Sequence, residues 1–201
     1  MERGLKFKKK KTIYINTFHG SPLKKMGIDT KTTTSKFRTS SPDIFYAQSK
    51  YDAETYSRAF EYDKSIMKIV GLPRNDELCN VTKKEIINIK NKLKLPLDKK
   101  IILYAPTFRE YNYDINGCFI APPIDINKWK KKLSKEYIVL FRAHYEVNKI
   151  LNIKDDDFIY NMTDYQYLND LLKISDILIS DYSSIMIDYS ILERPIYAYT
   201  Y

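Results

Sequence analysis

Short apolar runs recur along the chain, and stretches of roughly ten residues with helical periodicity separate many of them. The runs are rich in β-branched and aromatic residues, and they are nearly continuous rather than alternating. They lie within the segments KTIYINTF, DIFYAQS, KIVGLP, KIILYAPTF, YIVLFRAH, DFIYNM, DILISD and PIYAYTY. Continuous runs of this kind are typical of strands buried on both faces, as in parallel sheets. The pattern therefore predicts a mainly parallel β-sheet.

Helices are predicted between these runs, over residues 50–62, 82–93, 126–133, 165–174 and 183–192. Thr82 precedes one of them, and Glu85 follows three residues later, which is the signature of a capping box. Strands that alternate with helices form right-handed crossovers. The predicted fold is therefore an α/β domain with a doubly wound, mainly parallel, Rossmann-like sheet.

The length and composition predict one globular domain. The chain has 201 residues, of which 44% are hydrophobic, and it contains no apolar run long enough to cross a membrane. We expect a basic segment at residues 1–11 and one domain at residues 12–201, truncated at its C-terminus because the sequence ends on a strand-like run. Cys79 and Cys118 lie far apart and outside any metal-binding spacing, which favours a reducing, cytoplasmic compartment.

The charge balance leaves several partners open. The chain has 34 Lys and Arg against 25 Asp and Glu, a formal net charge of +9. Such a surplus is found in proteins that bind nucleic acids, anionic membranes or polyanionic substrates, but it also arises from lysines on solvated faces. Only the cluster from Lys6 to Lys11 is dense enough to predict attraction to an anionic bilayer, at about 1 kcal/mol per cation.

The first candidate site follows the first predicted strand. In open α/β sheets, ligands bind at the turns that follow the carboxyl ends of strands. His19 lies in such a turn, and Pro22 is suited to begin a helix whose free N–H groups face an anion. An imidazole held there could take a proton from a hydroxyl nucleophile. The alternative is a structural, hydrogen-bonded histidine. Substrate contacts are expected from the neighbouring Gly20, Ser21 and Lys24.

Arginines mark three further strand ends. Arg74 follows the run KIV in a turn that Gly71 and Pro73 also explain without any function. Two later turns contain Thr107 with Arg109, and Arg142 with His144, the second histidine of the chain. Each arginine alone could be a solvated surface group. Arg109, Arg142 and His144, together at one sheet edge, predict a phosphate site, because charge-assisted hydrogen bonds to phosphate are strong. Arg74 is a separate candidate, as a fork for a phosphate or a carboxylate.

A serine pair marks the last candidate turn. Asp181, Ser183 and Ser184 precede a predicted helix, where either Asp181 or Ser183 could serve only as the N-cap. Adjacent serines at a helix start are also a suitable cradle for a diphosphate. The sequence contains neither a Walker motif nor GxGxxG, so a P-loop nucleotidase and an ordinary dinucleotide enzyme are not supported.

These turns, in this order, resemble the CDP-glycerol glycerophosphotransferase family, which includes wall teichoic acid primases and polymerases. The resemblance covers residues 13–201 and depends on the segments FHGSPLK, GLPRND, YAPTFR, RAH and SDYSSIMIDY. The departures are mild: Phe18 and Phe108 stand where tryptophan is usual, and Ser21 and Ser180 where threonine is usual.

The resemblance implies a GT-B architecture, of which this chain would cover mainly the nucleotide-binding half. It implies that His19 is the general base on the acceptor hydroxyl and that His144 and Arg142 are phosphate ligands. It further implies that Ser183 and Ser184 contact the donor diphosphate, while Asp181 orients their loop. All these turns would then converge on one rim of the fold.

The implied reaction transfers glycerol phosphate from CDP-glycerol to the terminal hydroxyl of a lipid-linked glycerol phosphate chain, with CMP as the leaving group. No cofactor is expected, although Mg²⁺ is not excluded, and the expected location is the inner face of the cell membrane, where the lysine-rich start would meet anionic lipid. A ribitol phosphate transferase and a non-catalytic fragment that binds nucleotide or polyanion are the alternatives. Nucleic-acid binding ranks last because no RNA-binding motif is present.

Overall fold

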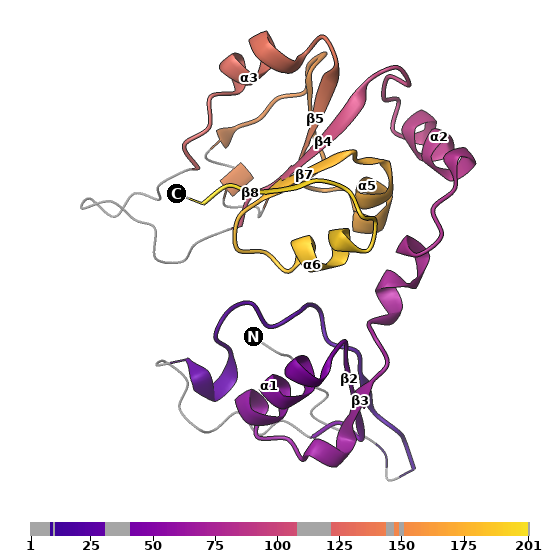
Figure 1. Ribbon diagram of the computed structural model, residues 1–201, viewed down its shortest axis with the longest axis vertical. Helices are drawn as coiled ribbons and strands as arrows, with labels where there is room; N and C mark the ends of the chain where they lie inside the picture. Colours follow the sequence, from indigo (N-terminus) through magenta and orange to yellow (C-terminus); the bar gives the residue numbers. More distant parts are fainter. Residues whose placement is uncertain are drawn as a thin grey trace, which may run out of the picture. The chain divides into compact units, whose positions relative to one another are not determined.

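The computed structural model describes residues 9, 11–30, 41–107, 122–143, 147–148 and 151–200. The chain divides into two compact units, unit 1 at residues 1–76 and unit 2 at residues 77–201. Each unit has a parallel sheet of its own, so the predicted strands form two sheets and not one (Figure 1). The single domain predicted at residues 12–201 stays a prediction, and each unit is described by itself.

Unit 1 contains a small parallel sheet with the strand order β1-β2-β3. Its elements are β1 (Ile15–Asn16), the 3₁₀ helix η1 (Gly27–Asp29), β2 (Ile44–Ala47), α1 (Lys50–Phe60), the 3₁₀ helix η2 (Lys64–Ile66) and β3 (Met67–Ile69). Helix α1 begins after Ser49, whose hydroxyl accepts a hydrogen bond from the backbone N–H of Asp52 at 3.1 Å. This N-cap satisfies one of the free donors at the start of the helix.

The core of unit 1 consists mainly of aromatic rings between the sheet and α1. Phe45 and Tyr56 are buried with ring centroids 5.1 Å apart, and Phe18 and Phe60 pack against them. The loop after β1 approaches α1 closely at Gly27, where a Cβ atom would lie 1.9 Å from the Ala59 carbonyl oxygen. Only glycine fits at this position, and the loop therefore lies directly against the helix.

Unit 2 has a five-stranded parallel sheet with the order β6-β5-β4-β7-β8. Its elements are α2 (Lys83–Lys92), β4 (Lys100–Ala105), α3 (Ile126–Leu133), β5 (Tyr137–Phe141), β6 (Ile159–Asn161), α5 (Leu168–Ile174), β7 (Ile177–Ser180), α6 (Ile185–Ser190) and β8 (Ile196–Ala198). The 3₁₀ helix η3 (Pro73–Leu78) crosses the division between the units. The strand order is that of a doubly wound sheet, in which the direction of winding reverses between β4 and β7.

Helices cover both faces of the unit 2 sheet (Figure 1). On strand β4, Ile101 and Leu103 face the cluster that contains residues of α2, α5 and α6, whereas Ile102 and Tyr104 face the cluster that includes Trp129 of α3. Burial on both faces explains why the strand sequences are continuously apolar instead of alternating. It also leaves the strand ends as the places where polar side chains can be presented.

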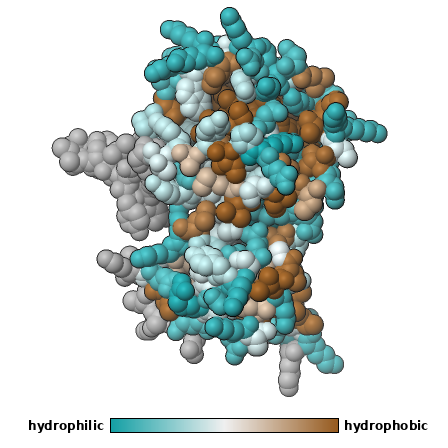
Figure 2. Space-filling view, in the orientation of Figure 1, coloured by the Kyte–Doolittle hydropathy of each residue, from teal (hydrophilic) through white to brown (hydrophobic). Residues whose placement is uncertain are grey.

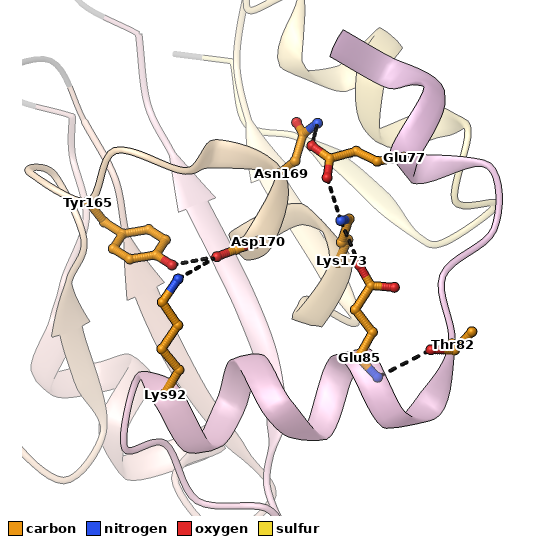
Figure 3. A network of polar contacts seen from close by, with 8 residues as sticks. All are labelled: Glu77, Thr82, Glu85, Lys92, Tyr165, Asn169, Asp170 and Lys173. Carbon is orange, nitrogen blue, oxygen red and sulfur yellow. Dashed lines mark hydrogen bonds and ion pairs between the residues drawn. The ribbon is translucent and has the colours of Figure 1, made fainter. Parts of the chain in front are cut away.

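A polar network joins α2 and α5 (Figure 3). The Lys173 ammonium, on a side chain only 4% exposed, donates to Glu77 Oε2 and Glu85 Oε1, both at 2.7 Å. Burial lowers the pKa of Lys173, but the hydrogen bonds to the two carboxylates outweigh it, so the net shift is upward. One turn earlier in α5, Asp170 accepts hydrogen bonds from Lys92 and from the Tyr165 hydroxyl.

The predicted elements are largely confirmed. Each apolar run contains a strand, all strand pairs are parallel, and Thr82 caps α2 by accepting from the Glu85 N–H at 3.2 Å. Four helices are shorter than predicted: α1 and α2 by two residues each, α5, which begins at Leu168, by three, and α6, which spans Ile185–Ser190, by four. The helix predicted to begin at Pro22 is wrong: residues 21–26 form no helix, and the next element is η1.

Candidate active site

The loop that carries His19 has an unusual backbone. Phe18 has a φ of +54°, a left-handed conformation that bulky residues rarely adopt, and its N–H donates to the Asn16 side-chain oxygen at 2.8 Å. Such a conformation costs on the order of 1–3 kcal/mol and persists only where the surroundings impose it. It is found preferentially at functional sites. Sequence reasoning missed this feature because phenylalanine is no marker of positive φ.

The environment of His19 favours the neutral imidazole. The side chain is exposed, but the protein atoms packed around the ring lower its pKa from the usual 6.5, and repulsion from the Arg74 guanidinium lowers it further. His19 and Arg74, two of the predicted site residues, therefore act on each other within unit 1. A neutral imidazole at neutral pH can accept a proton from a substrate hydroxyl.

The predicted residues next to His19 are part of the same loop. Gly20 is buried, and its carbonyl oxygen accepts a hydrogen bond from the Tyr56 hydroxyl at 2.6 Å. The Ser21 hydroxyl accepts from Gln48 Nε2 at 2.5 Å, and Lys24 is exposed farther along the loop. Their predicted contacts with substrate stay predictions. The structure adds Tyr56 and Gln48, which the sequence analysis did not select.

In unit 2, two predicted residues meet where the winding of the sheet reverses. Thr107 follows β4 and Asp181 follows the neighbouring strand β7. The Thr107 N–H donates to Asp181 Oδ1 and the Thr107 hydroxyl donates to Asp181 Oδ2, each at 2.9 Å. Asp181 is buried and both of its oxygens accept hydrogen bonds, so the carboxylate fixes one strand end to the other. This is the position at which doubly wound sheets bind their ligands.

The serine pair before α6 does not form a regular cap. Ser184 is the residue before the helix and makes no side-chain capping bond, while Ser183 Oγ accepts from the Ile185 N–H at 3.3 Å. The alternative in which Asp181 is the N-cap of this helix is wrong because Ser184 occupies the N-cap position. Helix α6 has only six residues, so its dipole is small. Diphosphate contacts by the two serines stay a prediction.

Arg142 has a structural role that the sequence analysis did not predict. Its Nη1 atom donates to the Met162 carbonyl oxygen at 3.0 Å and also to the Tyr165 carbonyl oxygen. The side chain is half-buried, and burial lowers its pKa. Only its remaining N–H groups are left to bind the predicted phosphate. The other two residues of this predicted phosphate site, Arg109 and His144, lie outside the described residues.

The described part of the chain lacks two features that would bear on its function. It contains no group of three or more His, Cys, Asp or Glu side chains that could hold a metal ion. None of its helices is long and apolar enough to cross a membrane. Of the two cysteines, Cys79 is exposed on the surface, and Cys118 lies outside the described residues.

The sequence matches the family described as CDP-Glycerol:Poly(glycerophosphate) glycerophosphotransferase over residues 3–201. The chain belongs to this family. It is 36% identical to the teichoic acid poly(glycerol phosphate) polymerase of Staphylococcus epidermidis, over 96% of this chain and 29% of that relative. It is 35% identical to the teichoic acid glycerol-phosphate transferase of Staphylococcus aureus, over 97% of this chain and 54% of the relative.

Solved structures of family members have the same fold. The wall teichoic acid polymerase TagF matches with a TM-score of 0.83 and 33% identity, over 97% of this chain and 51% of the polymerase chain. The predicted fold class, a parallel Rossmann-like α/β fold of the GT-B type, is therefore confirmed. The chain spans about half or less of the length of these relatives, so the activity of a whole protein belongs to the proposals below.

Proposed function

We propose that the chain transfers glycerol phosphate from CDP-glycerol to the terminal hydroxyl of a lipid-linked glycerol phosphate chain in teichoic acid synthesis, with release of CMP. The family match over nearly the whole chain carries this proposal. The names of the relatives support it, as does the structure of a histidine-to-asparagine variant of TagF soaked with CDPG. Cell-wall polymer synthesis is the process that these names share.

In the proposed reaction, His19 of unit 1 acts as the general base. The oxygen of the acceptor hydroxyl forms a bond to the β-phosphorus of CDP-glycerol, and the bond between that phosphorus and the bridging oxygen of CMP breaks. His19 takes the hydroxyl proton, and its lowered pKa supports this role because the imidazole is then unprotonated at neutral pH. We also propose a catalytic role for His144, and this part of the proposal is based on the sequence alone.

In unit 2, the donor diphosphate is proposed to bind at the strand ends that Thr107 and Asp181 join. Positioning and charge stabilisation account for most of the catalysis in phosphoryl transfer. A rigid loop at this point would position the donor diphosphate. The two hydrogen bonds between Thr107 and Asp181 support such rigidity. The remaining N–H groups of Arg142 and the hydroxyls of Ser183 and Ser184 are the proposed phosphate contacts.

The test is CMP release from CDP-glycerol in the presence of a glycerol phosphate primer. His19→Ala should lower the rate by about 10²-fold or more, since a positioned general base contributes at least that much. Thr107→Val removes one hydrogen bond to Asp181 and should mainly raise KM for the donor. Lys64→Ala, at an exposed position in η2, is the matched control and should behave like the wild type. An undiminished rate in His19→Ala would exclude His19 as the base.

Two alternatives can be tested. A ribitol phosphate donor is supported by relatives named teichoic acid ribitol-phosphate primase and poly(ribitol-phosphate) polymerase, 36% and 33% identical to this chain. Direct competition between CDP-glycerol and CDP-ribitol distinguishes the two donors. Binding without turnover is the other alternative, in which the residues of this chain hold the donor and release no CMP. Calorimetry that detects donor binding while no CMP is released would favour that alternative.

We also propose that the basic segment at residues 1–11 holds the protein on the anionic inner face of the cell membrane. Lys6 and the run from Lys8 to Lys11 support this location, since each lysine near such a surface contributes about 1 kcal/mol. Sedimentation with vesicles that contain anionic lipid should therefore decrease steeply as salt is added. Equal sedimentation with neutral vesicles would contradict the proposal.

A further inference from the structure

Two side chains, one in α1 and one just before it, hold the loop that carries His19. The Tyr56 hydroxyl, fully buried, donates to the carbonyl oxygen of Gly20 at 2.6 Å. Gln48, which lies between β2 and α1, donates from Nε2 to the Ser21 hydroxyl at 2.5 Å. The two residues that follow His19 are therefore each held by a side-chain hydrogen bond, Gly20 by a residue of α1 and Ser21 by a residue just before this helix.

Phe18 provides a second connection between His19 and α1. Its ring centroid lies 4.3 Å from that of His19 and 4.7 Å from that of Tyr56. The left-handed backbone at Phe18 turns the chain so that its ring packs into the aromatic core while His19 remains exposed. His19 is therefore connected to Tyr56 in two ways. Its ring packs against Phe18, which packs against Tyr56. Its backbone continues into Gly20, whose carbonyl oxygen accepts the hydrogen bond from the Tyr56 hydroxyl.

We propose that Tyr56 and Gln48 are positioning residues that fix the His19 loop in the geometry for proton transfer. This proposal rests on the proposed function, in which His19 is the base. A base must lie within about 2.6–3.2 Å of the group whose proton it takes, and a displacement of about 1 Å can cost roughly 10² in rate. Neither residue contacts the reacting atoms in this scheme, and both act through His19.

The kinetic test uses Tyr56→Phe, which keeps the ring and its aromatic contacts and removes only the hydroxyl. The expected result is a kcat about 10-fold lower with an unchanged KM for the donor, because the donor contacts proposed above lie in unit 2. Tyr51→Phe is the matched control: it removes a hydroxyl from the same helix at a position that is 66% exposed, and it should leave kcat unchanged.

A second measurement does not depend on activity. The chain has two histidines, so His144→Ala leaves His19 as the only imidazole in an NMR spectrum. In this background, Tyr56→Phe should shift and broaden the His19 signals. It should also raise the pKa of His19 toward 6.5, because the imidazole is no longer held in its packed position. A role of Tyr56 in stability alone would lower the melting temperature and leave these signals in place.

The outcomes separate this proposal from the proposed function. If the folded Tyr56→Phe variant keeps both the wild-type His19 signals and the wild-type kcat, the positioning role is overturned. If the signals move but the wild type releases no CMP, positioning holds and the transfer reaction fails. Should Tyr56→Phe not fold, Gln48→Ala carries the same test, because Gln48 precedes the helix and lies outside the aromatic core.

Discussion

The two units present their candidate functional residues in different ways. In unit 2, strands of a five-stranded sheet are covered on both faces, and Thr107 and Asp181 lie within two residues of strand ends that the hydrogen-bond ladder fixes. In unit 1 the strands are two to four residues long, and Ile69 on β3 is 55% exposed. Figure 2 shows hydrophobic residues interspersed with hydrophilic ones on the surface of the chain.

This difference changes what holds each site. In a buried sheet, hydrogen bonds to the neighbouring strands fix the end of each strand and therefore also the position of the residue that follows it. The His19 loop begins after a two-residue strand, so the ladder constrains it little. Instead it depends on the side chains of Tyr56 in α1 and Gln48 just before this helix, on Gly27 and on the strained backbone of Phe18. We therefore expect unit 2 to be sensitive to lost core volume and unit 1 to the loss of single polar groups.

The largest effect on stability is expected from Leu103→Ala in the central strand of unit 2. Leu103 is fully buried between helices and neighbouring strands, so truncation removes apolar contacts and leaves a cavity. The free energy of unfolding should fall by about 2–5 kcal/mol in a urea titration. Ile69→Ala in unit 1 is the matched comparison and should cost about 0.5 kcal/mol or less. Equal losses in the two variants would contradict the contrast between the units.

The central strands of unit 2 could be predicted from sequence because parallel strands that are buried on both faces have a continuous apolar pattern. The runs around Ile101 and Ile138 are examples in which burial on both faces is visible in the residues themselves. The division into two sheets could not be predicted in this way. Both sheets are parallel and both alternate with helices, so the local pattern is the same on either side of residue 76.

Sequence patterns indicated the candidate residues that directly follow strands. They did not indicate the residues that hold the His19 loop in place. Thr107 and Asp181 were found because they follow apolar runs directly. Tyr56 has the pattern of an ordinary core residue, and its hydrogen bond to Gly20 joins positions far apart in the sequence. The expected helix at Pro22 failed because proline at a helix start is a preference and not a signal sufficient by itself.

An intermediate effect is expected from the network around Lys173. The double variant Glu77→Gln, Glu85→Gln removes both carboxylates from a buried ammonium, but the two glutamates are 54% and 37% exposed. Because solvent screens such groups, we expect a loss of about 1–2 kcal/mol in the free energy of unfolding at neutral pH. Lys92→Met, which breaks an ion pair whose lysine is 56% exposed, is the control and should cost about 0.5 kcal/mol or less.

The same network predicts a dependence of stability on pH. The hydrogen bond from Lys173 lowers the pKa of Glu77 below its ordinary 4.5. The contribution of the ionised Glu77 carboxylate to the free energy of unfolding is therefore fully present above pH 4.5. It is lost as the pH falls through the lower pKa that Glu77 has in the folded state. Urea titrations should show this acid-side loss in the wild type and a smaller loss in the double variant. An identical pH dependence in both proteins would exclude the network as its source.

The smallest effect is expected from Arg74→Gln on the ionisation of His19 in unit 1. Packing around the ring is the larger cause of the lowered pKa and stays in place, whereas repulsion from the guanidinium is removed. The pKa of His19 should rise toward 6.5 without reaching it, measured by NMR titration in the His144→Ala background. Lys68→Gln on β3 makes the same change in net charge at an exposed position. If it shifted the His19 pKa as far as Arg74→Gln does, the effect would come from net charge, and the direct repulsion between Arg74 and His19 would lose its support.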